Sequence, residues 1–354
     1  MDVLIVLLYF NTGAGNGRQT QKQVSQFFPG FPRGRMARMA QIAAVIFGTF
    51  FVVAFGQDIS DEAKKDGPLA FTSLGYVRGT EGETEQGTRF AKYTKIPFAE
   101  PPIGGLRLRD PQSKKAWSGE LDGTQVAPPC LQVEYLEESA PRRSREDCLY
   151  LNIFTTNVLN NDQTSLKPVM VWIHGGGFTE GDASTLIDPE YLLDQDVVFV
   201  SIQYRLGLLG FLAVENSTDL TGNLGLKDQQ EALRWVQRNI VFFGGDPAKV
   251  TIFGVSAGAV SVHSQVLSPS ANGLFRAAIL QSGTALFYYE RIVHRTTEKK
   301  GSKVVEKLGC SNADDQLECL RLVEAEAFID PELDAQVWPV QVTTDSTGRM
   351  NGKD

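Results

Sequence analysis

Four short runs of apolar residues stand in the middle of the chain, at residues 169–173, 197–202, 250–253 and 276–280. Each run is continuous rather than alternating, which is typical of a strand that is covered on both faces. Between the second and third runs, residues 228–239 repeat apolar side chains at helical spacing and predict a helix. The alternation predicts an α/β fold with a mostly parallel sheet and helices on both faces.

The third run leads into a Gly-x-Ser-x-Gly sequence at residues 254–258, which an apolar helical segment follows. A nucleophile elbow needs this order of strand, tight turn and helix. The glycines at 254 and 258 leave room for the strained turn, which would present the hydroxyl of Ser256 at the mouth of the sheet. Ser256 is therefore the candidate nucleophile, and a chance Gly-Ser-Gly turn is the alternative when the motif is taken alone.

A glycine triplet at residues 175–177 follows the first apolar run and His174. Bare backbone amides at a strand end can turn toward one point, where they would stabilise the oxyanion of an acyl-transfer reaction. We expect the amides of Gly176 and Gly177, together with that of Ala257 after the candidate nucleophile, to form this oxyanion hole. A flexible glycine loop is the alternative, but such loops seldom follow five residues as apolar as these.

Further motifs accompany the two glycine sequences. They are Ile-Pro-Phe-Ala-Glu-Pro-Pro at 96–102, Glu-Asp-Cys-Leu-Tyr-Leu-Asn-Ile-Phe at 146–154, Asn-Leu-Gly-Leu-Lys-Asp-Gln at 223–229, Phe-Gly-Gly-Asp-Pro at 243–247 and Gln-Ser-Gly at 281–283. In this order, from about residue 75 to about residue 340, they resemble the type-B carboxylesterases, a family that includes cholinesterases, insect juvenile hormone esterases and catalytically silent neuroligin-like adhesion proteins. The resemblance implies an α/β-hydrolase fold and a serine hydrolase of carboxylic esters, with a Ser-Glu-His triad and no metal or organic cofactor.

Two departures from the family pattern bear on activity. Val255 stands where the family usually has Glu, or Gln in juvenile hormone esterases, so an apolar side chain would line the pocket beside the nucleophile. The family's acid and histidine follow the serine by roughly a hundred and two hundred residues, whereas 98 residues, 257–354, follow Ser256 here. We therefore expect a fold truncated before its last strands, without its triad acid and histidine, and a chain that is inactive or nearly so alone.

None of the three histidines is placed well for a general base, which must approach its partner within about 3 Å. His174 lies in the expected oxyanion turn, His263 lies about 10 Å along the helix that starts at Ser256, and His294 lies in a charged, irregular region. Three acidic residues predict a solvated turn rather than the triad acid: Asp330, Glu332 and Asp334.

The N-terminal segment has the pattern of a secretory signal. Three arginines precede an apolar run of fourteen residues, 42–55, and the small residues Ala54 and Gly56 suit a signal peptidase. Fourteen residues are too few to span a bilayer comfortably, so we expect secretion and no stable membrane span, with an uncleaved anchor as the alternative. The expected segments are an unstructured extension, a signal peptide, the partial esterase domain and a divergent tail, at 1–35, 36–56, 57–340 and 341–354.

The cysteines fit an oxidising compartment. An even number of them favours disulfides over free thiols, and the residues are Cys130, Cys148, Cys310 and Cys319. Three pairings are open to four cysteines, and the family resemblance implies that 130 pairs with 148 and 310 with 319. Metal binding is the alternative, but no C-x-x-C motif or histidine cluster supports it. Asn216 begins the one glycosylation sequon, Asn-Ser-Thr.

Composition narrows the functional classes. With a net charge of −8, the chain has no basic surface that would bind nucleic acid. Residues 131–147, which family topology places over the pocket mouth, hold no tryptophan and one aromatic residue, Tyr135, so cation–π recognition of choline is disfavoured. General carboxylesterase and juvenile hormone esterase activity on a small-molecule ester both stay open, and so does the oligomeric state.

The alternative function is a non-catalytic, neuroligin-like binding protein that presents the esterase fold to a partner. Ser256 within an intact motif favours the enzyme. Val255 and the lack of a suitable histidine favour the binding protein weakly.

Overall fold

The computed structural model describes residues 67–132, 144–157, 165–184, 188–214, 217–220, 222–286, 294–330 and 333, and the backbone alone at 4–8 and 294–299. Several predictions lie outside these residues. They concern the signal peptide at 36–56, the sequon residue Asn216, the acidic residues Glu332 and Asp334, and the tail at 341–354. Among the residues that are described, no helix is both long enough and apolar enough to cross a bilayer.

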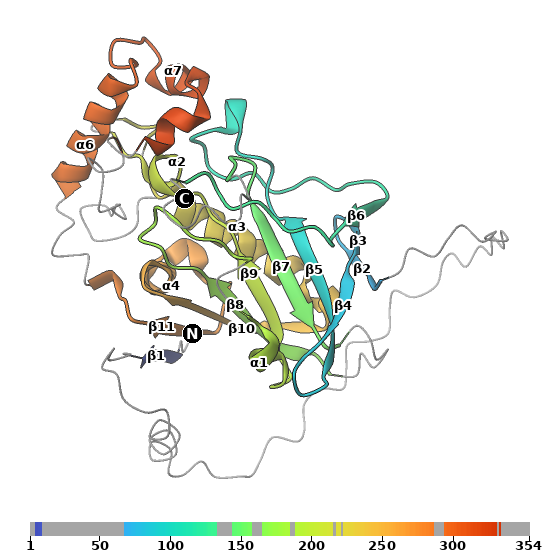
Figure 1. Ribbon diagram of the computed structural model, residues 1–354. Coiled ribbons are helices and arrows are strands. Elements are labelled where there is room, and N and C mark those ends of the chain that lie inside the picture. The colour runs from blue at the N-terminus through green and yellow to red at the C-terminus, as the bar shows by residue number, and fades with distance from the viewer. Residues whose placement is uncertain are drawn as a thin grey trace, which may run out of the picture. The chain divides into compact units, whose positions relative to one another are not determined.

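An eight-stranded sheet carries the fold, in the strand order β1-β11-β10-β8-β9-β7-β5-β4 (Figure 1). Its parallel half contains β8 (Lys167–Ile173), β9 (Val198–Ile202), β10 (Gly245–Val255) and β11 (Ala277–Gln281). These are the four strands that the continuous apolar runs predict. All five residues of β9 are buried, as expected for a strand that is covered on both faces.

The other half of the sheet is antiparallel and joins β9 to β7 (Tyr150–Thr155), β5 (Arg89–Pro97) and β4 (Thr80–Glu83). The sheet is therefore mixed, with four parallel and three antiparallel pairings. A separate three-stranded sheet lies beside it: β2 (Leu69–Thr72), β3 (Gly75–Arg78) and β6 (Glu120–Asp122). Exposed positions alternate with buried ones in β2, none of β4 is buried, and Arg89, Lys92 and Lys95 interrupt β5, so no continuous apolar run like those of the parallel half marks these strands.

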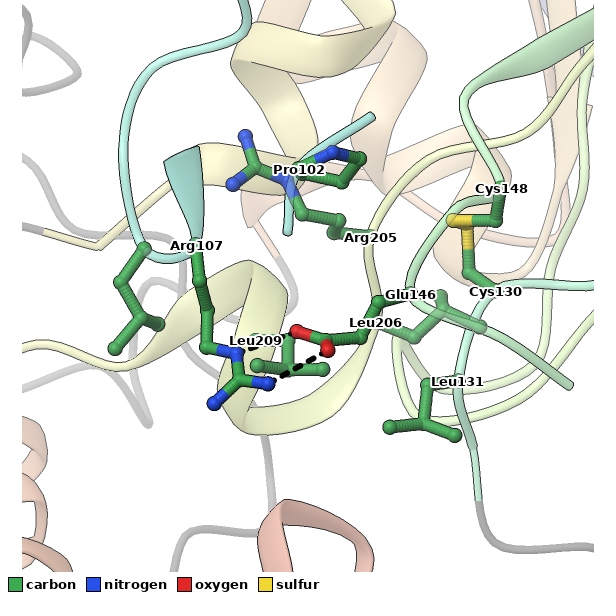
Figure 2. Close-up of a pocket in the computed structure, with 10 residues that line it drawn as sticks. Pro102, Arg107, Cys130, Leu131, Glu146, Cys148, Arg205, Leu206 and Leu209 are labelled. Atoms are coloured by element: carbon green, nitrogen blue, oxygen red, sulfur yellow. Dashed lines mark hydrogen bonds and ion pairs between the residues drawn. A yellow bond between two sulfur atoms is a disulfide. The ribbon is translucent and has the colours of Figure 1, made fainter. Parts of the chain in front are cut away.

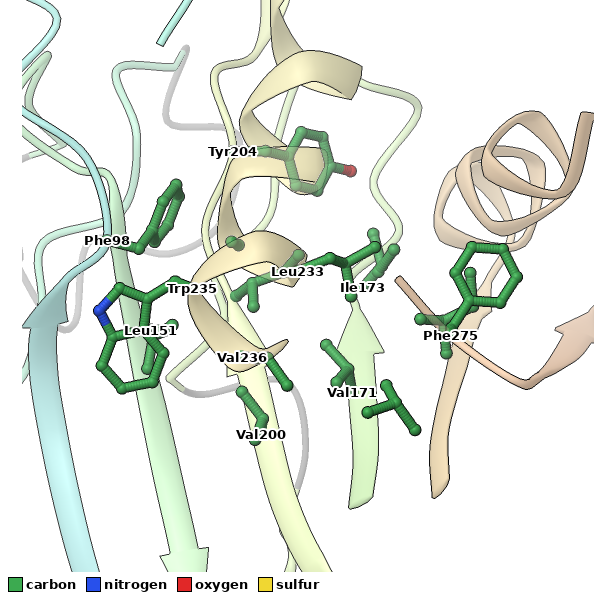
Figure 3. Packing of buried hydrophobic residues seen from close by; sticks show 14 of the residues in the cluster. Phe98, Leu151, Val171, Ile173, Val200, Tyr204, Leu233, Trp235, Val236 and Phe275 are labelled. Atoms are coloured by element: carbon green, nitrogen blue, oxygen red, sulfur yellow. The ribbon is translucent and has the colours of Figure 1, made fainter. Parts of the chain in front are cut away.

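Helices cover both faces of the main sheet, as the sequence predicts. On one face, α3 (Leu224–Asn239) and α4 (Ala257–Leu267) pack on the parallel strands through the largest apolar cluster, part of which Figure 3 shows. On the other face, Leu193 of α1 (Glu190–Leu193) packs with aromatic residues of the strands, Trp172, Phe199 and Phe253. Alternate residues of β8 serve the two faces, since Val171 joins the first cluster and Trp172 the second.

The helix expected at 228–239 begins four residues earlier, at Leu224. Its first turn contains Gly225, which hides the apolar pattern there. A glycine is needed at this position because an added Cβ would lie 2.5 Å from the carbonyl oxygen of Arg205.

A second apolar cluster joins α2 (Gly207–Phe211), α6 (His294–Lys307), α7 (Gln316–Leu322) and η6 (Ala325–Ile329). The prediction that His294 lies in an irregular region is wrong, because this residue begins α6. Charged residues dominate the first turns of α6, whereas Val304 and Val305 in its later turns are buried in this cluster. Further 3-10 helices are η3 (Gly104–Leu106), η4 (Ile240–Phe243) and η5 (Pro269–Ala271).

The outer edge of β11 is paired with β1 (Leu4–Leu8), in parallel and with Val6 opposite Ile279. These residues belong to the segment 1–35, for which the sequence predicts no structure, so that expectation does not hold at residues 4–8. A lone apolar strand has no core of its own, and here it takes its hydrogen-bonding partners from the edge of another sheet.

Candidate active site

The turn between β10 and α4 places Ser256 at the C-terminal end of a central parallel strand. Ser256 has a φ of 54° and a ψ of −120°, outside the ordinary regions for a residue with a side chain. The turn is held by the backbone: the Ser256 N–H donates to the Gln281 oxygen (2.9 Å), and the Ser256 oxygen accepts from the Val260 N–H (3.0 Å). The serine is solvent-exposed, as a nucleophile at a strained elbow must be.

The two glycines of the elbow are required by the neighbouring strand. A Cβ added at Gly254 would lie 2.6 Å from the carbonyl oxygen of Ile173, and one added at Gly258 would lie 2.1 Å from the same atom. Both distances are far inside van der Waals contact with backbone that is fixed by the pairing of β8 with β10. The Gly-x-Ser-x-Gly pattern is thus a packing requirement as well as a conformational one.

The glycine triplet lies directly beside the elbow. A Cβ added at Gly175 would lie 2.7 Å from the Val255 oxygen and 3.4 Å from the Cβ of Ser256. Gly176 (φ 102°) and Gly177 (φ 60°) then turn the chain in conformations that favour glycine. The structure therefore brings the triplet and the candidate nucleophile together.

The three amides expected to form the oxyanion hole are those of Gly176, Gly177 and Ala257. Within the described residues, no hydrogen bond engages any of these N–H groups. Ala257 is the first residue of α4, and the first N–H groups of a helix have no partner within it. These amides are left available for an acceptor outside the protein.

His174 supports the glycine turn from inside the protein. Its ring is completely buried and stacks on Tyr204, with ring centroids 4.3 Å apart, while its Nδ1–H donates to the Gly175 oxygen (2.8 Å). The Tyr204 hydroxyl donates in turn to the His174 backbone oxygen (2.9 Å). Burial lowers the pKa of His174 to about 4, so the ring is neutral at pH 7. This environment suits a structural residue rather than a general base.

His263 is also occupied. Its Nδ1 accepts a hydrogen bond from the Ala285 N–H (3.1 Å), which ties α4 to the segment after β11, and burial lowers its pKa. The third histidine, His294, is described by its backbone alone, at the start of α6. Asp330 is exposed, and its carbonyl oxygen accepts the N–H of Leu333, as in the turn that the sequence predicts.

One contact at the elbow could not be predicted from the sequence alone. Gly283 packs on the turn from the side of β11, since an added Cβ there would lie 2.6 Å from the Ser256 oxygen. Val255 is 38% exposed beside the serine, so its apolar side chain borders the site. The Gln-Ser-Gly sequence at 281–283 is one of the family motifs, but the role of its glycine depends on a contact with Ser256, which is distant in the sequence.

The profile of the Carboxylesterase family matches residues 66–348 of this sequence. The chain belongs to the carboxylesterase family. Its relatives include a juvenile hormone esterase of Tribolium castaneum, which is 41% identical over 263 residues, covering 73% of this chain and 44% of the relative. A pyrethroid hydrolase of Rattus norvegicus is 42% identical over 294 residues, covering 78% of this chain and 50% of the relative.

A solved structure is similar as well. The juvenile hormone esterase of Manduca sexta, crystallised with OTFP covalently attached, matches with a TM-score of 0.67 and 37% identity, over 74% of this chain and 50% of that one. The chain spans about half the length of the curated relatives it matches. The fold is accordingly the α/β-hydrolase fold of the carboxylesterases.

A buried ion pair explains one of the family motifs. Arg205, just after β9, and Asp228 of α3 are 4% and 0% exposed. The guanidinium donates to both carboxylate oxygens, at 2.7 and 2.8 Å, and the Arg205 backbone N–H adds a third hydrogen bond of 3.0 Å. Because every charge is paired, this site fixes the loop after β9 to α3.

Another ion pair, between Arg107 and Glu146, lines a small recess (Figure 2). Arg107 donates to both oxygens of Glu146, at 2.6 and 2.7 Å, next to the disulfide between Cys130 and Cys148. The enclosed space of this recess is about 10 Å³, far below a typical ligand pocket of about 300–1,000 Å³. Ser256 does not line it.

Both disulfides that the resemblance implies are present in the structure. Cys130 is bonded to Cys148 (S–S 2.00 Å) and Cys310 to Cys319 (S–S 2.02 Å). The first closes a loop that begins near the recess, and the second links the region after α6 to α7. The two bonds therefore stabilise separate parts of the carboxylesterase domain.

Proposed function

We propose that this chain carries the nucleophile and the oxyanion hole of a serine carboxylesterase. The observation that supports this best is the strained turn at Ser256 (φ 54°), which lies against the glycine triplet at Gly175. An intact elbow in a family of esterases favours this function over the non-catalytic binding protein.

In the proposed reaction, the Ser256 oxygen attacks the ester carbonyl and forms an acyl-enzyme, which water then hydrolyses. The negative charge that develops on the carbonyl oxygen is accepted by the amides of Gly176, Gly177 and Ala257. The loss of one such donor typically costs about 3–4 kcal/mol of transition-state stabilisation. The N-terminus of α4 favours the same charge.

The proton of the serine requires an acceptor, and neither described histidine side chain serves. His174 donates Nδ1–H to a carbonyl and is buried, and the Nδ1 of His263 is taken by the Ala285 amide. We therefore propose that the triad acid and histidine are supplied by residues outside this sequence. The 354 residues alone would show at most the residual activity of an oxyanion hole, about 10³–10⁴-fold over water.

The proposed substrate is a neutral small-molecule ester of a carboxylic acid. Val255 borders the nucleophile with an apolar, partly exposed side chain, which offers nothing to a cationic substrate group. General carboxylesterase and juvenile hormone esterase activity both agree with this surface.

The test compares residues 57–354 with a version extended to include the acid and histidine. The extended version should hydrolyse p-nitrophenyl acetate and become labelled by a fluorophosphonate, and Ser256→Ala should abolish both. The short version should turn over little ester. If the short version hydrolyses ester and Ser256→Ala abolishes this turnover, the proposal that the base lies outside this sequence is wrong. If the extended version shows no turnover that depends on Ser256, the proposed esterase function is wrong.

We also propose that the protein is secreted, with cleavage after residue 56 and a glycan on Asn216. The two disulfides support this, because such bonds persist in oxidising compartments. Expression in insect cells should yield protein in the medium whose mass falls on endoglycosidase treatment. An intracellular, endoglycosidase-insensitive product would contradict the proposal.

A further inference from the structure

The side chain of Gln132 binds both backbone groups of one residue, Gly181, at the end of the glycine turn. The Gly181 N–H donates to its Oε1 (2.8 Å), and its Nε2 donates to the Gly181 oxygen (2.9 Å). The same Nε2 also donates to the Cys130 oxygen (2.9 Å). One amide side chain thereby satisfies both backbone groups of a residue that is 49 positions away in the sequence.

Gly181 is closely connected to the expected oxyanion donors. An added Cβ there would lie 2.1 Å from Nδ1 of His174, so the residue packs against the ring that supports the turn. The preceding residue, Glu180, donates its N–H to the Gly176 oxygen (3.0 Å). A Cβ added at Gly176 would in turn lie 2.1 Å from the Glu180 oxygen. Residues 176–181 thus form a closed turn, and Gln132 holds its far end.

The clamp has a firm base. Cys130, two residues before Gln132, is completely buried and bonded to Cys148, which directly precedes the loop into β7. Ser144 adds hydrogen bonds to the Gln132 backbone at 3.3 and 3.4 Å. The disulfide loop therefore reaches the glycine turn through the Gln132 side chain.

The turn needs such a support. Four of its residues have positive φ, namely Gly176, Gly177, Phe178 and Gly181, and three of them are glycines, which restrict the backbone least. An oxyanion hole works only when its amides are held close to the developing charge, and a displacement of about 1 Å can reduce the rate about a hundredfold.

We infer that Gln132 is a positioning residue that holds the glycine turn, and with it the amides of Gly176 and Gly177, in place from the Cys130–Cys148 loop. This inference rests on the proposed function of those amides. A glutamine is required because Oε1 accepts from Gly181 while Nε2 donates to two carbonyl oxygens. Methionine keeps the length but neither interaction, and an ionised glutamate would face two carbonyl oxygens with a negative charge.

The first measurement is amide hydrogen exchange in the chain of 354 residues. In Gln132→Met, the peptide covering 175–181 should exchange about tenfold faster, because the Gly181 N–H loses its acceptor and the turn loses its contact with the Cys130–Cys148 loop. Gln125→Met, which changes an exposed glutamine, is the matched control and should leave this peptide unchanged. Unchanged exchange in Gln132→Met would overturn the inference.

The second measurement is kinetic, in the extended version of the enzyme. Gln132→Met should lower kcat about tenfold to a hundredfold while KM stays within about twofold, because the lost alignment acts in the transition state. Gln132→Glu should recover part of this loss relative to Gln132→Met as the pH falls and its carboxyl group gains a donating proton. An unchanged kcat, or a rise in KM alone, would overturn the inference. An extended wild type without Ser256-dependent turnover would instead refute the esterase function. The hydrogen-exchange measurement would still test whether Gln132 holds the glycine turn.

Discussion

The two halves of the candidate site are held in different ways. The elbow at Ser256 is fixed by backbone, since Gly254 and Gly258 lie against a carbonyl oxygen of β8 with no room for a methyl group. The glycine turn is closed by its own backbone hydrogen bonds, but side chains hold it to the rest of the protein, namely Gln132, His174 and Tyr204. The position of the candidate nucleophile therefore follows from the register of the sheet, whereas the position of the proposed oxyanion donors depends on side-chain contacts that substitution can remove.

The largest effect is expected at the elbow. Gly258→Ala places a Cβ 2.1 Å from the Ile173 oxygen, and the paired strands cannot yield without breaking their register. We expect a loss of about 3 kcal/mol or more in the free energy of unfolding, measured by urea denaturation. Gly105→Ala is the control, because nothing lies within 4 Å of its added Cβ. Equal stability of the two variants would show that the elbow is not fixed by backbone.

Lowering the pH should destabilise the folded protein through His174, whose ring supports the glycine turn. Burial lowers its folded pKa to about 4, whereas the ordinary value of an unfolded chain is about 6.5. Between these values the unfolded state binds more protons, so the free energy of unfolding falls by about 3 kcal/mol as the pH falls from 6.5 to 4. Above pH 6.5 and below pH 4, His174 does not change the dependence of the free energy of unfolding on pH.

Urea titrations of the wild type and of His174→Gln between pH 7 and pH 4 measure this effect. The variant should lose most of the slope, and the remainder includes His263, whose pKa burial also lowers. Identical slopes would contradict the assignment to His174.

A smaller effect is expected from Tyr204→Phe. The change keeps the ring that stacks on His174 but removes the hydroxyl that donates to the His174 oxygen. A buried carbonyl without its donor typically costs about 1–3 kcal/mol in the free energy of unfolding. Tyr76→Phe, at an exposed tyrosine of β3, should change stability by less than about 0.5 kcal/mol. A difference of zero between the two variants would mean that the hydroxyl does not support the turn.

The smallest effect on stability is expected from Val255→Glu, since this side chain is partly exposed. In the extended version, the new carboxylate should raise kcat/KM for a cationic ester relative to a neutral one by up to about fivefold, as expected for an exposed ion pair. Val241→Glu adds the same charge at η4 and should leave the ratio unchanged. Equal ratios in both variants would show that Val255 does not border the substrate.

The sequence predicts the parts of the fold whose signal is local. The strands of the parallel half are recognisable because each contains a continuous apolar run, and Ser256 is recognisable because its turn requires glycine two residues to either side. The antiparallel strands mix exposed and buried positions, so their sequences contain no continuous apolar run that would identify them. The roles of Gln132 and Gly283 could not be predicted, because each depends on a contact with a distant segment.

The strand Leu4–Leu8 occupies the outer edge of β11, so any other strand that pairs at this edge must compete with it. An edge offers one row of N–H and C=O groups, so this strand and any other that pairs there exclude each other. A tethered strand has the advantage of a high effective concentration, which a separate chain must match by mass action. Cleavage after residue 56 would remove the tether together with the strand. In the secreted form that we propose, this edge of the sheet would then be open to another strand.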